Sequence, residues 1–232
     1  MRLTIIRVLD VETTGLTDED RVIEIGWTDV ILPAREITAP QSYLCGTTRE
    51  ITPENRAIHH INPATLIGKP EFDWVVFNDQ AKADGVTCFA AHNASYDSIY
   101  VKPELPIICT YRCALRAWPE FSGHGNSVVR YSLEALGRQH GFNYSHAATH
   151  RAGPDSYVTA WTLRALLEDG HTGKTLLQWS KEPPLFPRIP LGKFKGQPWS
   201  AADNGWLQWA AFKSELSDDV KYNARLELDR RS

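Results

Sequence analysis

Long hydrophobic runs are missing from this 232-residue chain. No stretch approaches the roughly 20 apolar residues that a helix needs to cross a bilayer. The opening sequence, MRLTIIRVLD, meets a charge too early for the apolar core of a secretory signal. These absences argue against a membrane partner and predict a cytoplasmic protein.

Cysteine is scarce as well, and its spacing excludes a zinc finger. The four cysteines form no C-x-x-C pair and have no Cys or His partner at zinc-finger spacing, so free thiols are expected.

An excess of one charge is also missing, since 25 Lys+Arg stand against 28 Asp+Glu. The resulting net charge of −3 excludes a histone-like polycation and a strongly acidic tail protein.

Apolar runs rich in Ile and Val predict a sheet. Residues 3–11 form a nearly continuous run, which is typical of a central strand covered on both faces. Runs at 22–32 and 37–44 follow closely and predict a three-stranded meander. Shorter runs at 86–91 and 106–110 predict two further strands.

Helix signals lie between and after these runs. Thr52 and Asn62 each precede a proline, a pattern typical of helix starts, so two short helices are expected around His59 and His60. Further helices are expected in the segment with Tyr96, Asp97 and Tyr100, at 111–117, at 132–139, and from Gly153-Pro154 to Gly170.

A proline-rich segment divides the chain. Residues 181–190 hold four prolines in ten positions, which excludes a regular helix. We therefore predict a domain at 1–175, a semi-rigid linker at 176–190 and a small module at 191–232. Strands followed by alternating strands and helices predict a three-layer α/β or α+β arrangement for the first domain.

Two carboxylates lie in the first predicted strand. Asp10 and Glu12 are two residues apart, so strand geometry places both on one face, roughly 7 Å apart at the backbone. Acids at such spacing repel each other unless a divalent cation binds or one of them is protonated. Two solvated acids at a strand end explain the same pattern.

Two later segments place polar side chains at the ends of predicted elements. Asp97 follows a strand in the segment HNASYD. His150 precedes the helix that Gly153-Pro154 opens, and Asp155 lies in its first turn, so both project from one helix end. Surface or packing roles explain each residue taken alone, and an acid in a first turn favours the helix dipole.

The motifs D-x-E-T-T-G, HNxxxD and HRAxxD occur in this order. Together they resemble the DEDDh 3′-to-5′ exonuclease superfamily, over about residues 4–169. The resemblance implies a ribonuclease H-like fold with a mixed central sheet and flanking helices. It also implies that His150 is the general base and that four acids form the metal site: Asp10, Glu12, Asp97 and Asp155.

These residue types suit hydrolysis of a phosphodiester. Four acids supply the hard oxygen ligands of two Mg²⁺ ions, for which Mn²⁺ can substitute. Two ions about 4 Å apart can hold the attacking and leaving oxygens. The resemblance implies that Asp10 bridges both ions and that Glu12 and Asp155 complete the ion holding the nucleophilic water. It further implies that Asp97 serves the second ion, and His150 then takes the proton of that water.

The resemblance also implies contacts to the 3′-terminal nucleotide. In proofreading members a V-H-G-I segment packs the terminal base, and IHHI aligns with it here, with His60 in place of the glycine. Tyr96 matches an aromatic side chain that can stack on a base. The implied contact residues are Thr13, Thr14, Leu16, Ile58, His59 and Tyr96, and core packing explains each of them as well.

The tail resembles the short C-terminal module of exodeoxyribonuclease X-like proteins. The match lies in IPLGKFKGQPWSAADNGWLQWA, although Leu191 and Trp206 stand where that pattern has Phe and Tyr. Lys193 and Lys195, on a predicted glycine-bounded hairpin beside tryptophans, are expected to meet phosphates and bases. A small self-packing β-turn is the alternative.

The sequence thus predicts a metal-dependent exonuclease that removes nucleoside 5′-monophosphates from DNA, with single-stranded 3′ ends as the expected partner. An RNA 3′ exonuclease of the same superfamily is the alternative, because one hydroxyl distinguishes the two sugars. A noncatalytic module that binds nucleic acid or a polymerase would lack at least one of the five catalytic residues, and all five are present. A polymerase partner remains undetermined.

Overall fold

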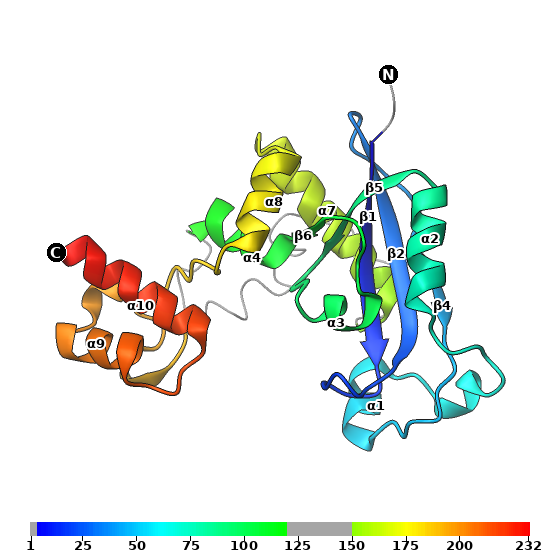
Figure 1. Ribbon diagram of the computed structural model, residues 1–232, viewed down its shortest axis with the longest axis horizontal. Helices are drawn as coiled ribbons and strands as arrows, with labels where there is room; N and C mark the ends of the chain where they lie inside the picture. Colours follow the sequence, from blue (N-terminus) through cyan, green and yellow to red (C-terminus); the bar gives the residue numbers. More distant parts are fainter. Residues whose placement is uncertain (1–3, 120–149) are drawn as a thin grey trace.

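The computed structural model describes residues 4–119 and 150–232 (Figure 1). Within these ranges six strands form one mixed sheet, in which β1 pairs antiparallel with β2 and parallel with β5. The strand order is β3-β2-β1-β5-β6, and β4 pairs with β2. The strands are β1 (Thr4–Thr13), β2 (Val22–Leu32), β3 (Glu36–Ile37), β4 (Gln41–Leu44), β5 (Val86–Ala91) and β6 (Ile107–Cys109). The strand that carries Asp10 and Glu12 is therefore paired on both edges.

The predicted strands are confirmed with one exception. A single strand over 37–44 is wrong, because two short strands, β3 and β4, occupy this region and are separated by irregular backbone around Pro40. Proline lacks the N–H that a ladder needs, so it interrupts pairing here.

Helices cover the sheet on both faces. They are α1 (Pro53–His59), the 3₁₀ turn η1 (Pro63–Leu66), α2 (Trp74–Ala83), α3 (Asp97–Val101), α4 (Thr110–Ala117), α7 (Ala152–Glu168) and α8 (Gly173–Lys181). The sequence did not predict α2, whose first turn is capped by the Asp73 carboxylate. The predicted helix at 132–139 lies outside the described residues.

Side chains of β1 alternate between two cores. Ile6 and Val8 pack in a cluster with residues of α4, α7 and α8. Leu9 and Val11 pack in a second cluster with residues of α2 and α3. Asp10 and Glu12 continue the even-numbered series, so they face the α7 side of the sheet. The predicted three-layer arrangement is confirmed.

The segment after α7 departs from the predicted boundary. Residues 176–181, assigned to a linker, are helical in α8, and Leu176 is fully buried in the core of the first domain. The irregular connection is therefore shorter and follows Lys181. Its carbonyl groups accept hydrogen bonds from both sides: Glu182 from Arg112 (3.0 Å), Pro183 from Arg116 (2.9 Å) and Pro184 from Asn223 (2.8 Å).

The C-terminal module has a small core of its own. It contains the 3₁₀ turns η3 (Gly192–Phe194) and η4 (Trp199–Ala201), followed by α9 (Asn204–Phe212) and α10 (Asp218–Arg231). Leu207 and Ala211 pack there against Val220 and Ala224. The two lysines lie in a loop closed at its base by the Ile189 N–H to the Gln197 carbonyl (2.9 Å) and the Gly196 N–H to the Ile189 carbonyl (2.8 Å), as in the predicted hairpin. This described stretch forms no flanking strands, however, and η3 closes a 3₁₀ turn from Lys195 N–H to the Gly192 carbonyl (3.1 Å). The polar segment at the end of the chain forms α10.

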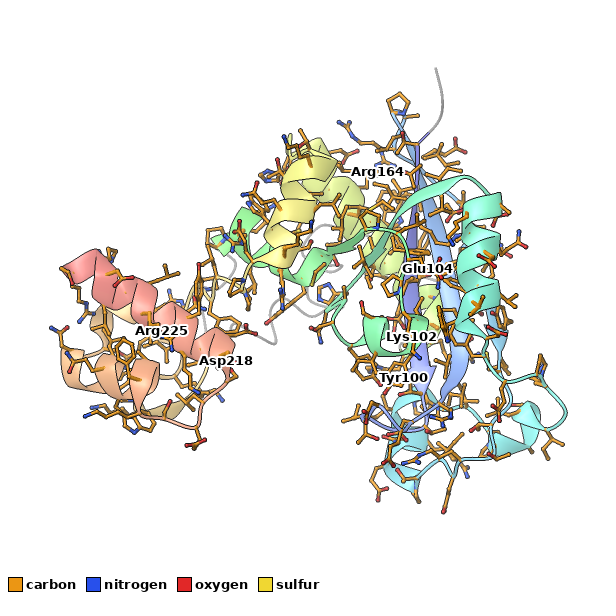
Figure 2. The ribbon with its side chains drawn as sticks, in the orientation of Figure 1. Tyr100, Lys102, Glu104, Arg164, Asp218 and Arg225 are labelled. Atoms are coloured by element: carbon orange, nitrogen blue, oxygen red, sulfur yellow. The ribbon has the colours of Figure 1, made fainter. Side chains whose placement is uncertain are left out.

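The module lies on the far side of α4 and α8 from the sheet. Figure 2 labels Asp218 and Arg225 on α10, well apart from Tyr100 and Lys102 beside β1. The four cysteines are free, as predicted, and all four are buried. In the two described ranges, no helix has the length and apolar character to cross a membrane.

Candidate active site

Three carboxylates meet where the end of β1 approaches the start of α7. Asp10, Glu12 and Asp155 each offer one ligand oxygen, and these oxygens lie within 4.8 Å of one another. Alternation along β1 supplies the first two, and the first turn of α7 supplies the third. Acids 145 residues apart in the chain thus share one site.

Burial and mutual repulsion destabilise the folded chain when this cluster is fully ionised. Burial, together with the charges of Asp97, Glu12 and Asp155, raises the pKa of Asp10 well above its ordinary value. Burial and the nearby Asp155 raise the pKa of Glu12 to about 8. Burial also raises the pKa of Asp155 to about 6. A divalent cation is the usual counter-charge for carboxylates held in this way.

Asp97 lies near Asp10 but does not belong to this group of three. It is the first residue of α3 and is 2% exposed. Burial raises its pKa to about 7, although its carboxylate accepts hydrogen bonds from its own N–H and from that of Val11. Its charge in turn raises the pKa of Asp10. The structure therefore brings the fourth predicted acid beside the site, outside the 4.8 Å group.

His150 lies immediately before α7 and is exposed to solvent. Its backbone is left-handed, with φ of 61°. Backbone groups of His150 and Arg151 hydrogen-bond to the Asp155 carboxylate. The Asp155 N–H donates in return to the Arg151 carbonyl (3.0 Å). The proposed base and one proposed metal ligand therefore share a single helix start.

A fifth acid, Glu24, was missed from the sequence. It lies on β2 directly opposite Glu12, and its carboxylate is paired with the Arg151 guanidinium (2.7 Å). An isolated Glu inside the apolar run VIEIGW could have indicated a buried partner, and Arg151 follows the candidate base directly. A single sequence gives no reason to pair residues 127 positions apart.

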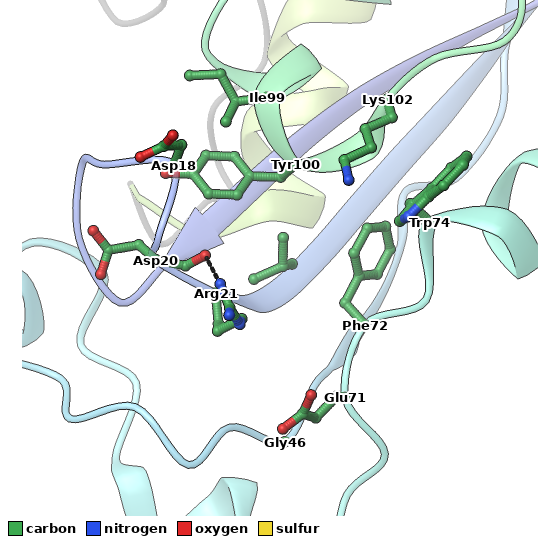
Figure 3. A pocket seen from close by; sticks show the side chains of 11 residues that line it. Asp18, Asp20, Arg21, Gly46, Glu71, Phe72, Trp74, Ile99, Tyr100 and Lys102 are labelled. Carbon is green, nitrogen blue, oxygen red and sulfur yellow. Dashed lines mark hydrogen bonds between the residues drawn. The ribbon is translucent and has the colours of Figure 1, made fainter.

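The threonines of the loop after β1 make hydrogen bonds to other side chains of the protein. The Thr13 hydroxyl contacts the Tyr96 hydroxyl (2.5 Å), and the Thr14 hydroxyl donates to Asp20 (2.7 Å). Leu16 is 78% exposed at the loop tip. Figure 3 shows the neighbouring pocket of about 280 Å³, where Asp18 lies beside Tyr100 and the Asp20 carboxylate points away from that ring.

The helix α1 presents the predicted pair Ile58 and His59. Ile58 is 49% exposed, whereas His59 is 2% exposed. His59 Nδ1 accepts the Ile61 N–H (3.0 Å), which places the ring hydrogen on Nε2, and within the described ranges this atom has no hydrogen-bond partner. Burial lowers the pKa of His59, which favours its neutral form.

His60 takes a backbone conformation that favours glycine, at the position where the V-H-G-I pattern has one. Its φ is 57°, in the left-handed region that favours glycine, and its N–H donates to the Arg56 carbonyl (2.8 Å). The substitution therefore preserves the helix end that carries His59.

The module that contains the two predicted lysines lies apart from β1 and α7, the elements that carry the acid cluster (Figure 1). Lys193 pairs with Asp203 (3.0 Å) and lies over the Phe194 ring (4.7 Å). Lys195 is exposed. Trp206 packs against both Trp199 and Trp209, so the tryptophans form one aromatic group.

Comparison with known proteins identifies the family of this chain. The family model described as "Exonuclease" (RNase_T) matches residues 8–162, a span that includes all five predicted catalytic residues. The chain is 32% identical over 210 residues to exodeoxyribonuclease 10 of Escherichia coli (strain K12), covering 88% of this chain and 89% of that protein.

Solved structures agree on the fold. The structure described as exonuclease X in complex with 5′ overhanging duplex DNA has 30% identity and a TM-score of 0.61, covering 75% of this chain and 99% of that chain. Cell-death related nuclease 4 has 16% identity and a TM-score of 0.58, covering 72% of this chain and 64% of that chain. The second likeness bears on the fold alone, and together they confirm the ribonuclease H-like arrangement.

Proposed function

This chain belongs to the exonuclease family, and from that premise we propose that it is a metal-dependent 3′-to-5′ exodeoxyribonuclease that releases nucleoside 5′-monophosphates. The observation that carries the proposal is the convergence of Asp10, Glu12 and Asp155 within 4.8 Å, next to His150 at the start of α7. Membership of the family supports hydrolysis, and the arrangement of the five residues supports the mechanism.

The donor set fits divalent cations. All three converging groups are carboxylates, the ligands that Mg²⁺ and Mn²⁺ favour, and Asp97 adds a fourth acid beside Asp10. We assign these four residues to two ions, with Mg²⁺ as the expected metal. When bound, the two ions would stabilise the charge on the attacking and leaving oxygens of the phosphodiester.

His150 is the proposed general base. A water oxygen bonds to phosphorus while the bond from phosphorus to the 3′ oxygen of the penultimate nucleotide breaks. An imidazole nitrogen of His150 takes the proton of the attacking water, and the departing oxygen takes a proton from solvent. The solvent exposure of His150 lets the acquired proton leave between turnovers.

Two exposed apolar side chains are the proposed contacts to the terminal base. Leu16 projects from the loop after β1, and Ile58 projects from α1. The Asn55 amide donates to the Thr14 carbonyl (2.5 Å), which ties this helix to this loop. Neighbouring His59 and its Nε2 atom are buried, so we propose that His59 supports Ile58 from within and does not itself touch the nucleotide.

The other predicted contact residues have internal partners. Thr13, Thr14 and Tyr96 hydrogen-bond within or across the loop, so we propose that they shape the subsite around Leu16. Tyr96 is only half-buried, and its ring remains available for stacking on a base.

DNA is the proposed substrate because the similar exonuclease X structure is described with duplex DNA bound. We propose that the 3′ end enters as a single strand, which lets the terminal base lie between Leu16 and Ile58.

End-labelled oligonucleotides test these proposals. Single- and double-stranded DNA, and RNA of the same sequence, are incubated with Mg²⁺, Mn²⁺ or EDTA. A 5′ label should yield a ladder that shortens from the 3′ end, a 3′ label should yield a labelled mononucleotide at once, and EDTA should stop both. Faster cleavage of RNA would contradict the DNA assignment, and cleavage in EDTA would contradict the metal mechanism.

A further inference from the structure

The Glu24 carboxylate is fully occupied by hydrogen-bond donors. Its two oxygens accept from Arg151 Nη2 (2.8 Å) and Nε (2.7 Å), in a two-point pairing. The first oxygen also accepts from the Ser42 hydroxyl (3.1 Å), and the second accepts from the Ala152 N–H (3.3 Å). No oxygen of this acid is left for a metal, although it lies opposite Glu12.

The same face of β2 contacts the start of α7 at two further positions. A Cβ atom on Gly26 would lie 2.2 Å from the Ala152 backbone carbon, so only glycine lets the helix approach this closely. The Thr28 hydroxyl hydrogen-bonds with the Ser156 hydroxyl (3.0 Å). Glu24, Gly26 and Thr28 alternate along the strand, so all three face the first turn of α7.

The pairing bears directly on the proposed catalytic groups. Arg151 is the helix cap of α7 and lies between His150 and the turn that carries Asp155. The left-handed backbone of His150 leads into this cap. A shift of the Arg151 side chain is therefore transmitted to the base through one peptide bond.

We propose that Glu24 and Arg151 are positioning residues, which lock the start of α7 on β2 and thereby aim His150 at the nucleophilic water. The inference rests on the proposed function, in which His150 is the base. Glu24 acts as an anchor for the arginine and contacts neither metal nor substrate.

The first test compares Arg151→Gln with Arg151→Lys in the full chain. Misplacement of a catalytic group by about 1 Å can lower the rate 10²-fold, so we expect Arg151→Gln to lower kcat by roughly 10- to 100-fold with little change in KM. Arg151→Lys should also remain slow, because one ammonium group cannot reproduce the two-point pairing. Full activity in Arg151→Lys, or a rise in KM alone, would overturn the proposal.

A second test asks whether Arg151 acts through the base. In a His150→Ala background, Arg151→Gln should lower kcat no further, because there is no imidazole left to aim. An equal loss in both backgrounds would overturn the proposal. If Arg151→Gln fails to fold, the double variant Glu24→Gln/Arg151→Gln leaves no unpaired charge and is used in its place.

Calorimetric titration with Mn²⁺ gives a readout besides activity. Glu24→Gln should bind Mn²⁺ as the wild type does, and a loss of binding would overturn the proposal that Glu24 acts on the base and not on the metal. Arg164→Gln is the matched control, since Arg164 forms a comparable ion pair with Glu168 (2.8 Å) on the exposed side of the same helix. A wild type without metal-dependent cleavage would contradict the proposed function, whereas an active wild type with unchanged Arg151 variants would contradict this inference alone.

Discussion

Removing one carboxylate from the acid cluster should separate its effect on chemistry from its effect on stability. Asp155→Asn, or Asp10→Ala, should abolish metal-dependent cleavage, because each takes away one of the three converging negative charges. In the metal-free protein the same change relieves repulsion, so the thermal midpoint should stay constant or rise. Asp229→Asn, an exposed position on α10, should alter neither cleavage nor midpoint. Near-normal cleavage with Mg²⁺ in Asp155→Asn would contradict the metal assignment.

The raised pKa of Glu12, about 8, predicts how the stability of the metal-free protein depends on pH. A glutamate in an unfolded chain titrates near 4.3. Between these values the folded chain binds more protons than the unfolded chain, so the free energy of unfolding falls as the pH rises. Glu12→Gln removes this pH-dependent loss of stability. The thermal midpoint of the variant, relative to that of the wild type, should therefore increase from pH 5 to pH 8.

Thermal scans in EDTA at several pH values check the effect of Glu12→Gln. Saturating Mg²⁺ should reverse the order, because only the wild type keeps a complete site and is stabilised by bound metal. A difference between the two proteins that does not vary with pH would contradict the burial and repulsion assigned to Glu12.

The base assignment of His150 predicts a loss in the chemical step. His150→Ala should lower kcat by roughly 10²-fold, the scale of general base catalysis, with Mn²⁺ binding retained. His171→Ala is the control, since this residue follows the other end of α7 and packs on Trp179. An unchanged kcat at pH 7 in His150→Ala would remove His150 from the mechanism.

Contact between β2 and α7 makes Gly26 a sensitive position. Gly26→Ala should push the first turn of α7 outward, because the added Cβ overlaps the Ala152 backbone. Overpacking of this kind costs about 1–3 kcal/mol of unfolding free energy. The displaced turn should lower kcat as well.

Denaturant titration and initial rates measure the two effects of Gly26→Ala. Gly173→Ala at the start of α8 is the matched control, since a Cβ there meets nothing within 4 Å, and it should leave both quantities unchanged. A fully stable and active Gly26→Ala variant would show that α7 can move without harm.

The elements could be predicted where local pattern determines them. Continuous apolar runs identified β1 and β2, and Gly153-Pro154 identified the start of α7. The helix α2 was missed because Val75 and Val76 are exposed, which hides the spacing of an amphipathic helix. Pairing of helices with strands, in contrast, is decided by tertiary contacts that leave no mark in a local window.

The residues of the candidate site fall into the same two groups, those that a local pattern indicates and those that only tertiary contacts bring together. Asp10, Glu12 and Asp155 belong to motifs with fixed spacing, so the sequence indicated them. Glu24 and Arg151 belong together only because β2 and α7 pack, and their partnership becomes visible in the folded chain.

The C-terminal module should hold DNA rather than cut it, because it lies apart from β1 and α7, the elements that carry the acid cluster. If Lys193 and Lys195 contact phosphates, Lys193→Ala/Lys195→Ala should raise KM and flatten its dependence on salt. The expected change in the log–log slope is ~0.7 per contact on single strands and ~0.9 on duplex. The kcat on saturating short oligonucleotides should stay near that of the wild type.

Measurement of KM against salt concentration tests the role of these lysines. Lys221→Ala is the control within the module, since this lysine lies on α10 near Asp218 (3.7 Å). Equal salt slopes in all three proteins would assign the module to a structural or partner-binding role.

The long separation between the two ends of the acid cluster also governs when a newly made chain becomes able to cut. Asp10 emerges early in synthesis, but Asp155 follows 145 residues later, and the contact between them is non-local. At about 5–20 residues per second, a ribosome needs roughly 7–30 s to span that interval. Under the proposed mechanism, unfinished or prematurely terminated copies that end before α7 lack an assembled centre and should leave nucleic acid near the site of synthesis uncut.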